Sequence, residues 1–186
     1  MLEALIVTLF PVAFLAVLFT GGELLRRRRI DMDGESPIDR TLFYGSKYLI
    51  LVLWMAMVLD TWGISLSFFD IPPPLKTAAV CVWAVGFMLL FAGRFALGNS
   101  FRIGHPKEST RLRVDGLFRV SRNPMYLGVY STLLASVLCT LNPVLLLFAA
   151  FIVVVHHRIV LAEETHLRNA FGQDYGEYCR RVKRYL

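Results

Sequence analysis

The chain has 186 residues, of which 56% are hydrophobic and only 18% are charged. A soluble domain has roughly 45–50% apolar residues, whereas here the mean hydropathy reaches +0.55. These values argue against a soluble enzyme, a disordered tail and a disulfide scaffold, and they favour one membrane-embedded domain, residues 1–186. The net charge of +6 does not indicate nucleic-acid binding, because the basic residues gather where apolar runs end.

The first apolar run, residues 2–20, has the length of ~20 residues that crosses a bilayer core. Because Glu3 lies at its start and Arg26–Arg29 follow it, we predict a membrane span with its N-terminus outside rather than a cleaved signal peptide. Pro11 lies inside this run and lacks an N–H, which frees a backbone carbonyl one turn earlier. We expect a neighbouring helix to satisfy that carbonyl.

Four more apolar runs predict four more spans, at about residues 42–59, 75–96, 125–141 and 144–160. Pro72–Pro74 precede the third span, and an Asn142-Pro143 turn precedes the fifth. No helix breaker follows the fifth run, so we expect it to leave the bilayer as a C-terminal helix over residues 156–186. The predicted fold is all-α, a polytopic integral membrane protein with about five transmembrane helices.

Charge placement predicts the topology. With five spans, every Lys and Arg except Lys76 falls on one side of the membrane, and the positive-inside rule assigns that side to the cytosol. The N-terminus is then outside and the C-terminus cytosolic. The longest polar segment, residues 98–124, becomes a cytosolic loop, and a loop of this length is usually functional or disordered.

Two polar clusters on that side are candidates for chemistry: residues 122–128, with the sequence RNPMYLG, and Arg158 with Glu163 and Glu164. The simpler interpretations are an interfacial anchor for the first and a solvated helix face for the second, with Arg168 pairing with Glu164. The His and Cys residues lack the spacing of metal ligands, so no metal site is predicted. No phosphate-binding glycine loop is present either.

The order of these motifs resembles the isoprenylcysteine carboxyl methyltransferases and the related phospholipid N-methyltransferases. The resemblance covers residues 98–186, and the matching positions are Gly116, Arg122, Pro124, Tyr126, Gly128, Glu163, Glu164, Leu167, Phe171, Gly172, Tyr175 and Tyr178. It implies an integral-membrane methyltransferase that uses S-adenosylmethionine and binds it in a cytosolic pocket built from the loop 98–124 and the end of the last span. The implied substrate is a lipophilic small molecule or lipid that enters from the bilayer.

The resemblance also implies which residues bind the cofactor. In that family the loop before the arginine-proline motif, the motif itself and the first glutamate of the pair hold it. By position, these residues are His105, Thr110, Arg111, Leu112, Arg113, Phe118, Asn123, Pro124, Met125, Tyr126 and Glu163. The chain departs from the prenylcysteine enzymes at Asn123, where they have histidine, and at Arg158, which lies one residue further from Glu163 than their substrate-side arginine.

Methyl transfer chiefly requires that donor and acceptor be held in near-attack geometry with water excluded. A carboxylate acceptor, such as that of an isoprenylcysteine-like molecule, needs no general base, and Arg122 or Arg158 would orient it. An amine acceptor, as in phospholipid N-methylation, must lose a proton, for which Glu164 is the candidate.

Two other classes of protein remain open at this point. Some sterol reductases, which use NADPH in the membrane, have a similar C-terminal hairpin, and a non-catalytic membrane protein would use the polar loop to dock a partner. Binding of S-adenosylmethionine, of NADPH or of neither separates the three. The oligomeric state is left open, and membrane lipids are the expected surroundings.

Overall fold

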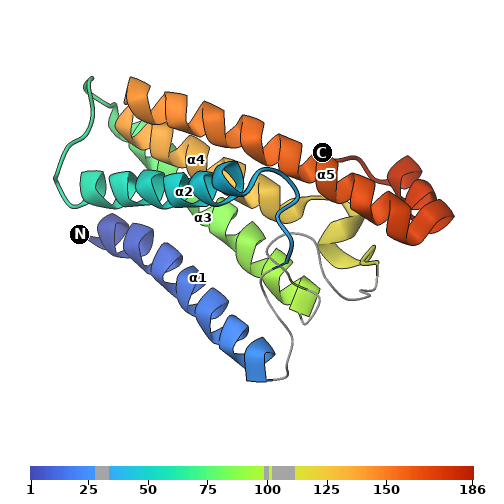
Figure 1. Ribbon diagram of the computed structural model, residues 1–186. Coiled ribbons are helices and arrows are strands. Elements are labelled where there is room, and N and C mark those ends of the chain that lie inside the picture. Colours follow the sequence, from blue (N-terminus) through green and yellow to red (C-terminus); the bar gives the residue numbers. More distant parts are fainter. Residues whose placement is uncertain (28–33, 99–100, 102–111) are drawn as a thin grey trace.

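A computed structural model describes residues 1–27, 34–98, 101 and 112–186, and helices are the regular elements of these ranges (Figure 1). The elements are α1 (Leu2–Arg27), α2 (Arg40–Thr61), α3 (Pro73–Leu97), the short 3-10 helix η2 (Gly116–Arg119), α4 (Pro124–Thr140) and α5 (Pro143–Arg181). The all-α class predicted from the sequence is confirmed.

Four of the helices, α1, α2, α3 and α5, are long and apolar enough to cross a membrane, and α4 is a shorter apolar helix. Each begins and ends within a few residues of a predicted span, except where α1 and α5 continue beyond the apolar run. The prolines act as expected, because Pro73, Pro124 and Pro143 each open a helix, where a missing N–H costs no hydrogen bond.

The prediction of a helix over residues 156–186 is wrong at its C-terminal end. Helix α5 is kinked at Gly172, whose φ of 50° lies in the left-handed region, which glycine adopts without a steric penalty. The helix ends at Arg181, and residue 182 is already extended. The last five residues therefore form a tail that folds back against the protein instead of continuing the helix.

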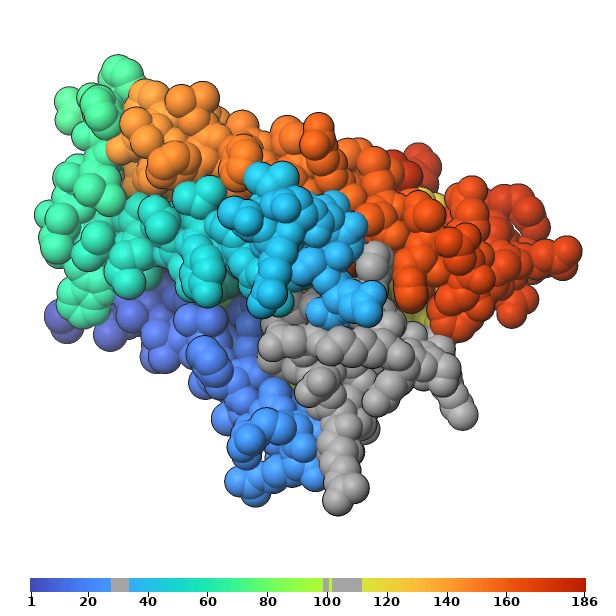
Figure 2. All heavy atoms as spheres, viewed as in Figure 1, coloured from blue at the N-terminus to red at the C-terminus, as the bar shows by residue number. Residues whose placement is uncertain are grey.

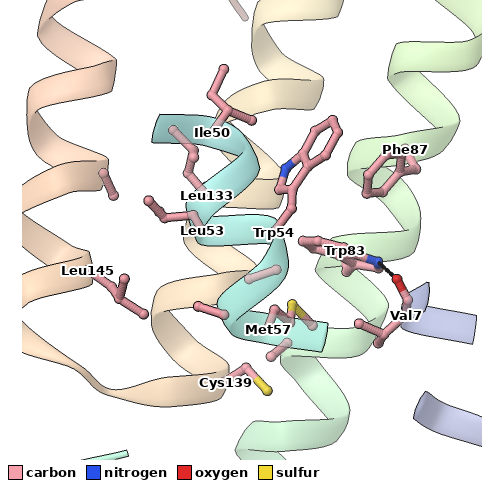
Figure 3. Packing of buried hydrophobic residues seen from close by; sticks show 14 of the residues in the cluster. Val7, Ile50, Leu53, Trp54, Met57, Trp83, Phe87, Leu133, Cys139 and Leu145 are labelled. Carbon is pink, nitrogen blue, oxygen red and sulfur yellow. Dashed lines mark hydrogen bonds between the residues drawn. The ribbon is translucent and has the colours of Figure 1, made fainter. Parts of the chain in front are cut away.

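A core of large aromatic and aliphatic side chains holds α1 to α4 together and reaches the first turns of α5 (Figure 3). Trp54 of α2 and Trp83 and Phe87 of α3 lie at its centre, with the rings of Trp54 and Phe87 4.8 Å apart between centroids. The Trp54 indole N–H donates to the Thr132 hydroxyl of α4, at 3.0 Å. The buried indole is thus hydrogen-bonded, as buried polar groups usually are.

Pro11 leaves the Val7 carbonyl without its helical donor, and the structure supplies another. The indole N–H of Trp83 donates to the Val7 carbonyl oxygen at 3.2 Å, and both residues are fully buried (Figure 3). A neighbouring helix therefore satisfies the carbonyl that proline frees, as the sequence predicted.

Helices α3 and α4 approach closely at two glycines. A Cβ on Gly86 would lie 2.9 Å from the Gly128 carbonyl oxygen, and a Cβ on Gly128 would lie 2.8 Å from the Gly86 carbonyl oxygen. Small residues permit such contact between apolar helices. This contact fixes where the start of α4, which carries the RNPMYLG motif, stands relative to α3.

The two ends of the bundle differ in chemistry. At one end Asp60 accepts hydrogen bonds from Ser67 and Lys76, and Asn142 donates to the Leu66 carbonyl. At the other end lie the start of α4, η2 and the second half of α5 (Figure 1), and this part of α5 extends beyond the other helices (Figure 2). The candidate site belongs to this second end.

Candidate functional site

The site is built where α4 begins against the middle of α5. Asn123 is the residue before α4, and Pro124 is the first residue of the helix. Proline is favoured at this position because its fixed φ suits the first turn of a helix. Just before it, the backbone N–H of Arg122 donates to the Lys183 carbonyl at 3.0 Å. The motif is therefore held between a helix start and the C-terminal tail.

Tyr126 and Glu163 form the inner pair of the site. The Tyr126 hydroxyl, on the first turn of α4, donates to Glu163 Oε1 of α5 at 2.9 Å, and both side chains are partly buried. Burial raises the pKa of Glu163 to about 7, although the hydrogen bond from Tyr126 and the charge of Lys47 oppose the rise. This carboxyl group can therefore change its charge near neutral pH.

The neighbouring Glu164 is buried and bound by two arginines. Arg122 Nη2 lies 2.8 Å from Glu164 Oε1, and Arg184 Nη2 lies 2.9 Å from Oε2. Burial opposes ionisation of Glu164, but the hydrogen bonds from Arg184 and Arg122 outweigh it and lower its pKa. The expected helical partner Arg168 is thus replaced by residues distant in sequence.

The same arginine also fastens the C-terminal tail. Arg122 Nη1 donates to the carbonyls of Val182 and Cys179, at 3.0 and 3.4 Å, and the amide of Asn123 donates to the Arg184 carbonyl at 3.1 Å. The two hydrogen bonds from the Arg122 guanidinium are charge-assisted and are therefore the stronger ones. Arg122 and Asn123 therefore connect the C-terminal tail to the start of α4.

Phe118 lies in a different cluster from Tyr126. It is buried with Tyr175, Tyr178 and Val182, and Leu112 packs partly against them. The Tyr178 hydroxyl donates to the Phe118 carbonyl at 2.7 Å. These contacts, to which the matched positions Tyr175 and Tyr178 contribute, stabilise η2 against the end of α5.

The remaining predicted residues are spread more widely. Arg113 and Arg158 are exposed, and Met125 packs into the main core beside Gly93. His105, Thr110 and Arg111 lie outside the described residues. The structure therefore brings together Arg122, Asn123, Tyr126, Glu163 and Glu164 from the predicted set.

Two residues that the sequence analysis did not select also lie here. Arg184 completes the ion pairs of Glu164, and His156 packs its ring against Tyr126, with ring centroids 5.7 Å apart at 89°. His156 stands seven residues before Glu163, two helical turns, so a search along one face of the predicted helix would have found it. No group of three or more potential metal ligands occurs within the described part of the chain.

Comparisons with known proteins indicate the family of this chain. The family model of the phospholipid methyltransferases matches residues 75–174, which run from the start of α3 past the kink in α5 and make up more than half of the chain. A relative named methanethiol S-methyltransferase 1, from Bradyrhizobium diazoefficiens, is 26% identical over 198 aligned residues, which cover 97% of this chain and 66% of the relative. The chain thus spans just under two thirds of that relative's length. The match to the family model shows that this chain belongs to the phospholipid methyltransferase family.

Proposed function

We propose that the protein transfers a methyl group from S-adenosylmethionine to a small lipophilic acceptor at the membrane surface. The observation that carries the proposal is the Tyr126–Glu163 pair, which joins the RNPMYLG motif of α4 to the first glutamate of α5 at 2.9 Å. Membership of the phospholipid methyltransferase family supports the reaction class.

The chemistry of this pair fits the cofactor. Glu163 accepts one hydrogen bond through Oε1, and a carboxylate can accept several more, as ribose hydroxyls or an amino group require. A negative charge in a partly buried position also attracts a cation more strongly than one in water. Bound there, S-adenosylmethionine would supply an electrophilic methyl group on a sulfonium cation.

The other polar residues of the site position the C-terminal tail and shield the Tyr126–Glu163 pair, and they take no part in the reaction. Both oxygens of Glu164 already accept hydrogen bonds from arginines, and a lowered pKa makes it a weak proton acceptor. We assign Glu164, Arg122 and Arg184 to holding the C-terminal tail over the start of α4. A tail held in this way excludes water from one side of the Tyr126–Glu163 pair.

A thiol is the acceptor class that we favour. Of the two arginines considered for orienting a carboxylate, Arg158 is exposed on α5 and Arg122 is bound to Glu164 and two backbone carbonyls. The isoprenylcysteine-like carboxylate, the first acceptor suggested by the sequence, therefore has less support than a small apolar thiol. The relative named methanethiol S-methyltransferase 1 points to the same acceptor class.

The first test is calorimetric titration of detergent-solubilised protein with S-adenosylmethionine and, separately, with NADPH. We expect saturable binding of the methyl donor that is weakened at least tenfold, about 1.4 kcal/mol, by Glu163→Ala and by Tyr126→Ala. Binding of NADPH alone would favour a reductase, and binding of neither would favour a protein that only docks a partner.

A second assay identifies the acceptor. Purified protein is incubated with methyl-labelled S-adenosylmethionine and one acceptor at a time: butanethiol, a prenylcysteine analogue or a phosphatidylethanolamine. We expect label in the thioether. Label in a methyl ester or in the phospholipid amine instead would replace the thiol by that acceptor class.

A further inference from the structure

His156 is a buried polar residue for which the pairs described above provide no partner. Its side chain is 3% exposed, and neither ring nitrogen forms a hydrogen bond with the described residues. Buried polar atoms without a partner are uncommon in folded proteins. An ionisable residue inside a membrane protein that faces other helices usually serves a function.

Its position links it to the Tyr126–Glu163 pair. His156 and Glu163 lie two turns apart on the same face of α5, and Tyr126 of α4 contacts both. The hydroxyl of Tyr126 donates to Glu163, while its ring meets the imidazole at right angles, with centroids 5.7 Å apart. One aromatic ring therefore separates the carboxyl group assigned to the cofactor from the unpaired imidazole.

The surroundings of His156 are mostly apolar. Its helix neighbour Val155 and, one turn further on, Ile159 are buried with Phe43 of α2. The Lys47 ammonium of α2 lies 4.2 Å from the centre of the Phe43 ring. Apolar surroundings of this kind favour a small apolar molecule with one dissociable proton over a charged head group, which would lose its hydration.

We propose that His156 is the proton acceptor for a small thiol substrate, an inference that rests on the proposed function. A thiol needs such a group because its thiolate form is the nucleophile. As the acceptor sulfur gains the methyl group, its S–H bond breaks and the proton passes to a ring nitrogen of His156. The electron pair of the broken methyl–sulfur bond stays on the donor sulfur.

The charges of this step suit a poorly solvated site. One positive charge is present before the step, on the donor sulfonium, and one is present after it, on the imidazolium. No additional charge has to be created away from water, where isolated charges cost most. A general base in this position typically contributes about 10²–10⁴-fold to a rate.

Two thiols and two variants test the proposal. Butanethiol is almost fully protonated at neutral pH, whereas thiophenol is largely ionised and does not need a base. We expect His156→Phe, and likewise His156→Gln, to slow methylation of butanethiol about 100-fold or more and that of thiophenol less than about tenfold. S-adenosylmethionine affinity should stay within about twofold, since Glu163 and Tyr126 remain. The matched control is His157→Gln, at the adjacent histidine, which bonds to Tyr185 instead. Glutamine keeps a hydrogen-bonding group for that tyrosine, so both rates should stay within about twofold.

A second readout follows the rate with pH at saturating S-adenosylmethionine. Without a base only the rare thiolate form of butanethiol reacts, so its methylation by His156→Phe should rise about tenfold for each pH unit between pH 7 and pH 9, whereas the rate of the wild-type protein should rise much less. Equal losses with both thiols, or an equally steep rise in the wild-type protein, would overturn the role of His156. If the wild-type protein methylates neither thiol, the thiol acceptor favoured above is wrong, and this role of His156 with it, whereas binding of S-adenosylmethionine still tests the methyltransferase itself.

Discussion

Glu163 carries a carboxyl group that titrates near neutral pH, because burial raises its pKa to about 7. Above that pH it is negatively charged and attracts the sulfonium cation, and below it the attraction is lost. If only the ionised form binds, affinity for S-adenosylmethionine should rise about tenfold between pH 6 and pH 8, since the ionised fraction rises from about one tenth to about nine tenths.

Calorimetric titrations across that pH range check this prediction, with Glu163→Gln as the reference. The amino group of the cofactor itself titrates at about 7.7–8.0 if it behaves as an ordinary α-amino group, and the glutamine variant retains that contribution. We expect the pH dependence of the variant to be much flatter. An unchanged profile in Glu163→Gln would remove Glu163 from the cofactor site.

The Trp83 indole replaces the N–H that Pro11 lacks, and the two residues should therefore be energetically coupled. In the wild-type protein Trp83→Phe leaves the buried Val7 carbonyl without a donor, which costs about 1–3 kcal/mol in addition to lost packing. In a Pro11→Ala background the new backbone N–H can satisfy that carbonyl, so the same substitution should cost about 1 kcal/mol less, within the range of hydrogen bonds inside membrane proteins.

The four proteins of this double-mutant cycle are compared by reversible unfolding in detergent–lipid micelles. The coupling is the difference between the two Trp83→Phe effects, so packing losses common to both backgrounds cancel. Additive effects would mean that the hydrogen bond contributes nothing to stability.

At the scale of elements, the contact between α3 and α4 depends on two glycines. A methyl group at Gly86 or Gly128 would meet the backbone of the facing helix, so Gly86→Ala and Gly128→Ala should each destabilise the protein by about 1–3 kcal/mol through overpacking. Gly45 of α2 has no atom within 4 Å of such a methyl group. Gly45→Ala should therefore be neutral or stabilising by up to about 1 kcal/mol, as expected for alanine in a helix.

The stability of all three variants is measured as the melting temperature, with thermal unfolding followed by tryptophan fluorescence. Since α4 carries the RNPMYLG motif, the two destabilising variants should also weaken binding of S-adenosylmethionine, whereas Gly45→Ala should not. Equal melting temperatures for Gly86→Ala and Gly45→Ala would show that the helices adjust to the added methyl group without cost.

The elements could be predicted from the sequence better than the contacts between them. Apolar runs of membrane-spanning length predicted the helices. The missing N–H of Pro11 predicted that another group must donate a hydrogen bond to the Val7 carbonyl. The tail was predicted wrongly, because its extended shape depends on Arg122, some sixty residues earlier in the chain, donating to its carbonyls. Arg184 lies outside the matched motif, and only the fold of the tail brings it to Glu164. The helical spacing to Glu163 could have pointed to His156, but only the packing of α4 against α5 shows its contact with Tyr126.

For the whole molecule, the number of crossings decides where the termini lie. Helix α4 has 17 residues, or about 25 Å at 1.5 Å per residue, which is short for a hydrocarbon core of about 30 Å. Its two ends nevertheless lie at opposite ends of the bundle: Cys139 is 3.7 Å from Asp60, and Arg122, just before α4, contacts Glu164. We therefore expect α4 to cross, with the local bilayer thinning to match it.

Five crossings place the termini on opposite sides, and charge selects the orientation. Lys76, the lone Lys or Arg on the side that we predict to be outside, is 3.4 Å from Asp60, which offsets its charge there. The other end holds most of the basic residues that the structure describes, so by the positive-inside rule we expect it to face the cytosol. Reporter proteins fused after residues 70, 116, 142 and 186 and expressed in a bacterial host show on which side of the membrane each of these positions lies. We expect alkaline phosphatase to be active after residues 70 and 142, and green fluorescent protein to fluoresce after residues 116 and 186. If α4 does not cross, fusions after residues 116 and 142 report the same side and the reporter at residue 186 switches to the outside, which would separate the site from the cytosolic cofactor and contradict the proposed function.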